Sequence, residues 1–551
     1  MGDDFTAEPG PEPTGAVNGS PQVNGNGNGN VARATARQVD PVGSRRSARS
    51  LPAGVASVLL LGMPTVLAFF SGGYGVRTQL LAAAVAFAAL ALLCLSAPWP
   101  LIQGRSAAVA LAGLAGLAAW TWLSVRWAPV RNSAAQDTAR LGLYAAVFAG
   151  GAIALRGATV RRAAPVVLLG GASVVALYAL AGRLLPQLVP SAGGGRAESR
   201  LDQPLTYWNA MGILCAIGVL LAVATAADED RPRAGRAAAC ALAVPCALAQ
   251  YMTFSRGALV ALAAGLVVLV LVGPGPRIAL SAGLGIGTAA ILAVVLEAFP
   301  AVLDLGGSRA DQQSQGLVVA LLLVAGMTAA ALAHDRLSGR QRRSVSTLGP
   351  RLRRTLVTTG VLALLAVGGL MAASTERTEL QRDSAGRLRS LSTDRFAYWD
   401  VALGSFAAHP LAGVGSGGFA SEWRRERSSP EFLRDAHSLY VETLAELGLV
   451  GFGLLLAFMA AVLAGLRRGR REAPGDPFLV AAAAVLCAVA VHAGLDWDWE
   501  MPTVALPALL LAAGVTARPA APRPSPPEGA VAEPGFVLST ADVGPPVAGP
   551  R

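Results

Sequence analysis

The sequence predicts an all-α, polytopic integral membrane protein, with about fourteen transmembrane helices and one large external loop. Composition is the first reason: 53% of the 551 residues are hydrophobic and only 14% are charged, which is wrong for a soluble domain of this length. The second reason is the pattern of apolar runs. Runs of about 20 apolar residues, the length that a helix needs to cross a bilayer, recur along most of the chain.

Taken in order, these runs predict where each span lies. The predicted spans are near 51–71, 79–96, 106–125, 140–155, 164–181, 207–227, 237–253, 257–273, 278–297, 316–333, 355–373, 439–466, 478–495 and 503–517. They divide the chain into eleven helices over 51–373, an external loop over 374–438, and three helices over 439–517. No cleavable signal peptide is expected, because the first apolar run starts late and is long enough to stay in the membrane.

The two tails are expected to be disordered and cytoplasmic. Residues 1–50 contain "NGNGNGN" and many Gly, Pro and Asp, and residues 518–551 are rich in Pro and Ala. Neither tail can bury enough apolar surface to offset the entropy of ordering.

Arginines in alternate connections predict the orientation. All 45 basic residues are arginine, and they gather before the first span and in 156–162, 231–236, 335–354 and 467–471. The positive-inside rule makes these connections cytoplasmic, together with both termini, in a multi-pass protein of the inner (cytoplasmic) membrane. The net charge of +11 then reflects topology, and no nucleic-acid partner is expected.

The sequence contains no pattern typical of a metal or disulfide site. The five cysteines all lie in apolar runs and are interpreted as small core residues. No His, Cys and Asp cluster has metal-ligand spacing. We therefore expect no metal and no cofactor.

Arginines on the predicted external side point to an anion. The segment 374–438 carries nine of them, either as a solvated surface or as a basic surface that meets a diphosphate, whose oxygens fit arginine's planar fork. "TFSRGAL" places Arg256 at the external end of a hairpin, and Arg196 and Arg200 precede the span that opens near Tyr207. An ionisable group at the rim of a span indicates function unless it snorkels to the interface.

Four motifs occur in an order that resembles a known family. They are "TFSRGALVALAAG", "DRFAYWDVALGSFAAHPLAGVGSGGF", "AHSLYVETLAELGLVGFGLLL" and "HAGLDWDWEMP". With the topology, they are similar to the O-antigen ligase and O-antigen polymerase family of bacterial membrane glycosyltransferases, over roughly 200–515. The loop "RWAPVRNSAAQDTAR" after the third span also resembles a family feature.

The resemblance implies an activity and a set of site residues. Family members have a GT-C-like helical fold and move glycan from a polyprenyl-diphosphate carrier to a glycan, lipid or protein acceptor at the outer face of the membrane. They need no nucleotide sugar and no metal, and further partners in surface-polysaccharide assembly are possible. The loop caps the active site. The family's functional arginines and histidine correspond to Arg256, Arg395 and His437.

The chemistry of these residue types agrees with those roles. Two arginines can stabilise the charge that grows on a leaving diphosphate. His437 precedes the span near Leu439 and can take the acceptor's proton, or else bind a phosphate or orient the acceptor. Glu442 is a candidate to orient His437 or to act as the base, and Asp496 a candidate to bind sugar hydroxyls.

Three alternatives remain open from the sequence. The first is the transferase. The second is a transporter or flippase of an anionic lipid-linked glycan or solute, which would also explain the many spans and the arginines at their rims. The third is a non-catalytic scaffold for wall assembly. Convergence of Arg256, Arg395 and His437 at one face would favour the transferase. The motifs do not separate a ligase from a polymerase, because both share them.

Overall fold

The computed structural model describes residues 41–189, 199–341, 395–427 and 432–518. The described residues form helices and no strand. Contacts divide the chain into two units, Met1–Ala48 and Arg49–Arg551, and the second unit holds the helical bundle. All of the packing and site geometry that follows lies in the second unit.

The long helices coincide with the predicted spans. They are α1 Pro41–Ala68, α2 Val76–Ser96, α3 Arg105–Ser124, α4 Arg131–Ala154, α5 Ala158–Leu184, α6 Trp208–Ala227, α7 Arg233–Met252, α8 Arg256–Val272, α9 Gly275–Leu296, α11 Arg309–Gln341, α16 Leu439–Glu472, α17 Pro477–Ala493 and α18 Pro502–Thr516. Every predicted range overlaps one of these helices except 355–373, which lies outside the described residues. The short helices are η1 Ser71–Gly73, α10 Pro300–Leu303, α14 Arg395–Ala408, α15 Phe419–Glu426 and η2 Asp498–Glu500.

By length and composition, the described part of the chain has eight helices that can cross a membrane. Three shorter apolar helices, α8, α17 and α18, accompany them. The all-helical membrane fold is thus confirmed, whereas the count of fourteen spans stays a prediction.

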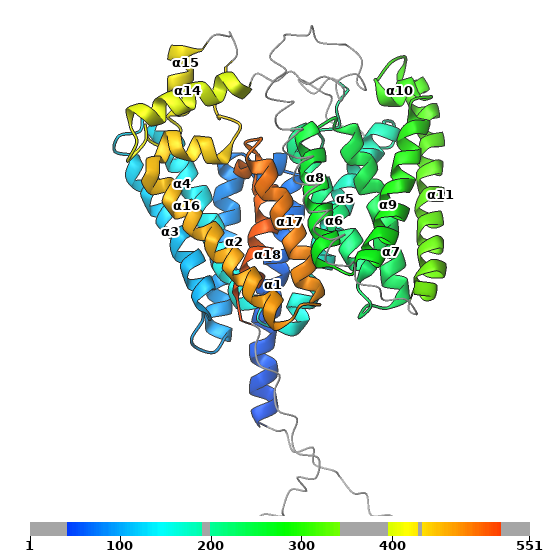
Figure 1. The fold of residues 1–551 in the computed structure, drawn as a ribbon, viewed down its shortest axis with the longest axis horizontal. Coiled ribbons are helices and arrows are strands. Elements are labelled where there is room, and N and C mark those ends of the chain that lie inside the picture. The colour runs from blue at the N-terminus through cyan, green and yellow to red at the C-terminus, as the bar shows by residue number, and fades with distance from the viewer. Residues whose placement is uncertain (1–40, 190–198, 342–394, 428–431, 519–551) are drawn as a thin grey trace, which may run out of the picture. The chain divides into compact units, whose positions relative to one another are not determined.

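The middle helices of the bundle are buried, whereas outer helices such as α11, which lies at the edge of the bundle in Figure 1, leave apolar side chains exposed. In α6 every residue from Asn209 to Ala227 is buried, and α18 is buried along its whole length. By contrast, only 28% of the residues in the apolar stretch of α2 are buried, and only 22% of those in the apolar stretch of α11. Their exposed side chains include Leu80, Phe87 and Leu321. Lipid tails solvate such a surface and water does not, so the bundle is that of a multi-pass membrane protein.

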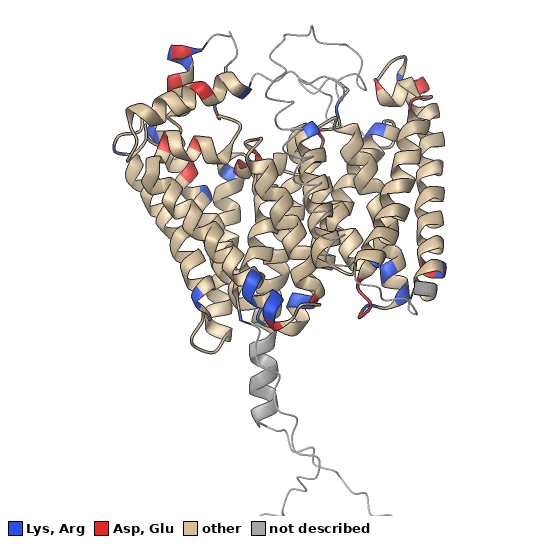
Figure 2. Cartoon of the chain, viewed as in Figure 1, with Lys and Arg blue, Asp and Glu red and all other residues tan. Residues whose placement is uncertain are grey.

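The connections between helices meet at two opposite ends of the bundle. At one end, Arg156 donates to the Leu101 carbonyl, and Arg161 pairs with Asp476 at 2.8 Å. At the other end, which we call the site end, lie the connections 69–75, 199–207, 253–255, 432–438 and 494–501. Figure 2 shows basic residues at the first end around the end of α16, and mixed charges at the site end.

We expect labelling of single cysteines to distinguish these two ends. Glu426→Cys, on exposed helix α15, should react with an impermeant thiol reagent in intact cells, because the arginine pattern puts 374–438 outside. Ala473→Cys, exposed between α16 and α17, should react only after the cells are opened. The opposite labelling pattern would mean that the protein has the reverse orientation in the membrane.

Helix α16 is interrupted at Gly448, which the apolar run did not predict. Gly448 has φ 62° and ψ −163°, and a Cβ there would stand 2.3 Å from the Leu411 carbonyl oxygen, so this conformation and this contact both need glycine. Backbone groups of the loop 410–418 form hydrogen bonds with the backbone of α16 at the interruption. Leu449 N donates to the Pro410 oxygen at 2.8 Å, and Gly415 N to the Glu446 oxygen at 2.8 Å. The interruption therefore fastens this loop to the start of α16.

Candidate functional site

Arg256 opens α8 at the site end, where the local sequence fixes its place. Ser255 is the N-cap, and its Oγ accepts from Ala258 N at 3.3 Å. The turn before it packs on α6 at Gly212, where a Cβ would stand 2.8 Å from the Ala258 Cβ and 3.0 Å from the Thr253 Oγ1. A helix N-terminus and an arginine side chain both favour the binding of an anion, so this position suits an anionic ligand.

Two further arginines, Arg200 and Arg395, lie near Arg256. Leu201 N donates to the Met252 oxygen at 2.9 Å and so ties the Arg200 segment to the end of α7. The Arg200 guanidinium lies 4.5 Å from the centre of the Trp208 ring, and burial lowers its pKa. Arg395 and Arg200 both act electrostatically on Arg256. Arg196, the fourth predicted arginine, lies outside the described residues.

Asp496 is the buried anion that holds Arg395. Its side chain is 1% exposed, and its Oδ2 is 2.7 Å from Arg395 Nη2. Asn209 Nδ2 donates to Oδ2 and the Tyr207 hydroxyl to Oδ1, both at 2.6 Å. Burial alone would raise the pKa of Asp496, but Arg395, His437 and His492 lower it below its ordinary value. This carboxylate is therefore ionised, and described side chains already contact both of its oxygens.

The same environment changes the acidity of Tyr207. Burial, and then the charge of Asp496, raise the pKa of its hydroxyl well above the ordinary value. Tyr207 therefore stays protonated and donates to Asp496. Its ring also stacks on Trp497, with 4.6 Å between the ring centres, so the start of α6 and the 494–501 connection are held together.

His437 lies two residues before α16, as the sequence predicted. Its φ of +54° is in the left-handed region, an unusual conformation that marks candidate functional positions. Its Nδ1 is 3.0 Å from the Asp435 carbonyl oxygen, and its ring centre is 5.4 Å from that of Tyr398 on α14. Glu442 Oε2 accepts from Ala436 N at 2.7 Å, so Glu442 holds the backbone next to His437.

Acidic residues that the sequence did not single out lie around the base of this segment. Arg140 pairs with Glu500 at 2.8 Å and with Asp137 at 3.1 Å, and Arg434 lies 3.6 Å from Asp137. Burial is the main cause that raises the pKa of Asp435 well above its usual range, and Glu500 adds to it. Burial also raises the pKa of Glu500, which Arg140 partly counteracts. These residues form a buried network in which carboxyl groups outnumber guanidinium groups.

The glycine-rich stretch "GVGSGGF" forms a turn and not a phosphate loop. Gly413, Gly415 and Gly417 all have positive φ. Glu446 accepts from Gly417 N at 2.8 Å and from Phe419 N at 3.1 Å. These backbone amides therefore already donate hydrogen bonds to a protein carboxylate.

Some polar residues of the site gave only a weak signal in the sequence. His492 lies 2.8 Å from Asp498 and is 1% exposed, yet in sequence it reads as the end of an apolar run. Tyr207 and Asn209 stand where a span opens, where aromatic residues are ordinary interface anchors. Asp137 and Arg140 belong to the loop "RWAPVRNSAAQDTAR", the one weak indication of this network.

Comparison with known families gives a match for one part of the chain. Residues 312–456 match the family model described as O-antigen ligase. Arg395, His437 and Glu442 lie inside the matched segment, whereas Arg200, Arg256 and Asp496 reach the same end of the bundle from outside it. No curated protein matches the chain. The resemblance predicted from the motifs is confirmed over this segment: the chain is a multi-pass membrane protein in which residues 312–456 match the O-antigen ligase family.

Proposed function

We propose that this protein is a glycosyltransferase that moves glycan from a polyprenyl-diphosphate carrier to an acceptor hydroxyl at the outer face of the cytoplasmic membrane. The observation that carries the proposal is the convergence of Arg200, Arg256, Arg395 and His437 from separate segments at one end of the bundle. A transporter would need polar groups along a path between the two membrane faces. A scaffold would not need these four residues to converge. The O-antigen ligase domain supports the transferase class.

The arginines would bind the diphosphate of the donor. In the transfer, the bond between the sugar's anomeric carbon and a phosphate oxygen breaks, and the electron pair leaves with the polyprenyl diphosphate. Arg256 and Arg395 gain interaction energy as that negative charge grows, so they stabilise the transition state more than the bound substrate. Arg200 adds a third positive charge nearby. In this proposal, the arginines supply the charge that a divalent ion supplies in other transferases.

His437 would take the proton from the acceptor hydroxyl. Its Nδ1 lies within hydrogen-bond distance of a carbonyl oxygen, which can only accept, so Nδ1 is the nitrogen that carries the proton in the neutral ring. Nε2 then has the lone pair that a general base needs. Asp496 would keep Arg395 in place and would stabilise the protonated ring by its charge.

Deletion of the gene would test this function directly. We expect lipid-linked glycan to accumulate on its carrier and surface glycan to change. Single repeat units on the carrier would identify a polymerase, and full-length polymer on the carrier would identify a ligase. A normal carrier pool with normal surface glycan would contradict the proposal.

Asp496→Asn should lower the transfer rate by about ten- to a hundredfold, because Arg395 loses the charge that orients it. The acid side of the pH–rate profile should also move to lower pH, since a protonated His437 loses a neighbouring anion. A purely structural role for Asp496 would lower the rate without moving the profile. Asp400→Asn, an exposed carboxylate on α14, is the matched control.

A further inference from the structure

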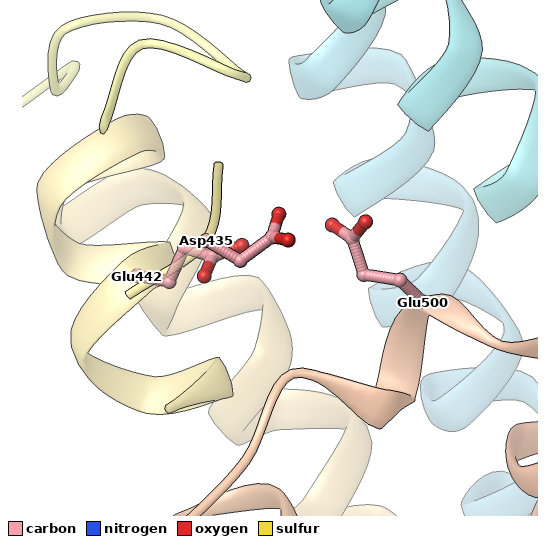
Figure 3. Close-up of side chains that lie close together, drawn as sticks. All are labelled: Asp435, Glu442 and Glu500. Carbon is pink, nitrogen blue, oxygen red and sulfur yellow. The ribbon is translucent and has the colours of Figure 1, made fainter. Parts of the chain in front are cut away.

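Three carboxylates from two parts of the chain meet beside the proposed active site. Asp435 lies before α16, Glu442 lies in the first turn of α16, and Glu500 ends η2. One oxygen from each lies within 4.8 Å of the others. Figure 3 shows the Glu500 carboxylate facing that of Asp435, with Glu442 on the far side of Asp435.

The charges around these carboxylates do not balance. Five carboxyl groups interact here, those of Asp137, Asp435, Glu442, Glu446 and Glu500. The guanidinium groups of Arg140 and Arg434 oppose them. Two positive charges against five leave an excess of three negative charges if all five groups are ionised. Buried charge of one sign is costly unless a cation or protons neutralise it.

Glu500 gives the second indication that a ligand is needed here. Its side chain is more than nine-tenths buried, with 7% exposed. Arg140 Nη2 donates a hydrogen bond to Oε1 at 2.8 Å, whereas Oε2 has no hydrogen-bond partner among the described residues. A buried carboxylate oxygen that lacks a donor and faces another carboxylate is the position of a cation ligand.

We propose that Asp435, Glu442 and Glu500 bind one divalent cation of the oxygen-preferring class, calcium or magnesium. Only oxygen ligands are present, which suits these hard ions. Oxygens that bind one calcium ion at about 2.4 Å lie at most about 4.8 Å apart, and the three carboxylate oxygens lie within that limit. This inference does not rest on the proposed transfer activity.

The cation would hold two parts of the site together. Asp435 supplies the carbonyl oxygen next to His437 Nδ1, and Glu500 belongs to the connection that carries Asp496. A shared ion therefore fastens the segment of the proposed base to the segment that holds Arg395. The ion acts on structure and does not need to touch the donor's phosphates.

The test uses the purified full-length protein in detergent, stripped of metal with a chelator and returned to metal-free buffer. Calcium and magnesium are then added separately at about 1 mM, and bound metal and the thermal unfolding temperature are measured. We expect one ion per chain and a higher unfolding temperature. Glu500→Gln and Asp435→Asn should each weaken binding at least about tenfold, since even outer groups of a metal site have effects of that size.

A matched variant shows whether the ion binds at these three carboxylates. Glu426→Gln removes an exposed carboxylate at the same end of the molecule and should bind like the wild type. Absence of bound ion and of any shift in the wild type would overturn the proposal and would mean that shared protons neutralise the cluster. Unchanged binding in both Glu500→Gln and Asp435→Asn would place the ion elsewhere. If one variant fails to fold, the other and Glu442→Gln decide the outcome.

Discussion

Arg256→Ala and Arg395→Ala should each abolish glycan transfer, while protein level and membrane insertion stay normal. Removal of one charge-assisted contact to a developing oxyanion costs about 2.7–4 kcal/mol, or roughly a hundred- to a thousandfold in rate. The measurement is turnover of a polyprenyl-diphosphate-linked oligosaccharide by purified protein. In the proposed reaction both side chains bind the diphosphate, and they come from different segments of the chain, so neither is expected to replace the other.

Two further variants separate this role from packing. Arg395→Lys keeps the charge but not the planar fork, so it should recover only part of the rate, because an ammonium group cannot bind two phosphate oxygens in the same geometry. Arg425→Ala removes an arginine that is 70% exposed and pairs with Glu422, and it should behave as the wild type. Near-normal turnover in both Arg256→Ala and Arg395→Ala would show that these arginines only snorkel at the interface.

Substitution of His437 should stop transfer and leave donor binding intact. His437→Asn is the sharpest variant, because asparagine tolerates the left-handed backbone at this position and removes the proton acceptor. Donor affinity, measured by binding of the carrier-linked glycan, should change little. The turnover rate should fall at least about a hundredfold, in the range of general base catalysis.

The pH dependence then distinguishes the two roles that remain open for His437. A base must be neutral, so activity should be full above the imidazole's titration, which ordinarily lies near pH ~6.5, and should fall as the pH drops through it. A phosphate-binding cation would give the reverse trend, and His437→Arg would then keep substantial activity. Activity in His437→Arg would therefore rule out the base. His409→Ala, at an exposed histidine after α14, is the matched control.

Much of the fold was predictable because a membrane imposes a simple rule on the sequence. A segment in hydrocarbon must satisfy its own backbone, so an apolar run of the right length becomes a helix. This is why the range 207–227 predicted α6, and 439–466 most of α16. The run could not predict the interruption at Gly448, because what stabilises it is a loop more than twenty residues earlier in the chain.

The site was predictable only where a motif carried it. Arg256, Arg395 and His437 were found through resemblance to the O-antigen ligase family, and Arg200 through its place at a predicted rim. Asp435 lies outside the four motifs and Glu500 lies inside the fourth, but nothing in the motifs indicated that these two carboxylates meet. Sixty-four residues separate them in the sequence, and each stands in a polar stretch where a carboxylate is ordinarily solvated.

The sequence by itself determined that this is a helical membrane protein with the motifs of an O-antigen ligase, because apolar length and local motifs are properties of contiguous residues. Only the tertiary structure decided which side chains meet. It paired Asp496 with Arg395 and Tyr207, and it placed His437 against the Asp435 carbonyl. Those contacts join segments hundreds of residues apart or depend on a backbone conformation that no composition specifies. They exist because helix packing brings one end of each segment to the same place.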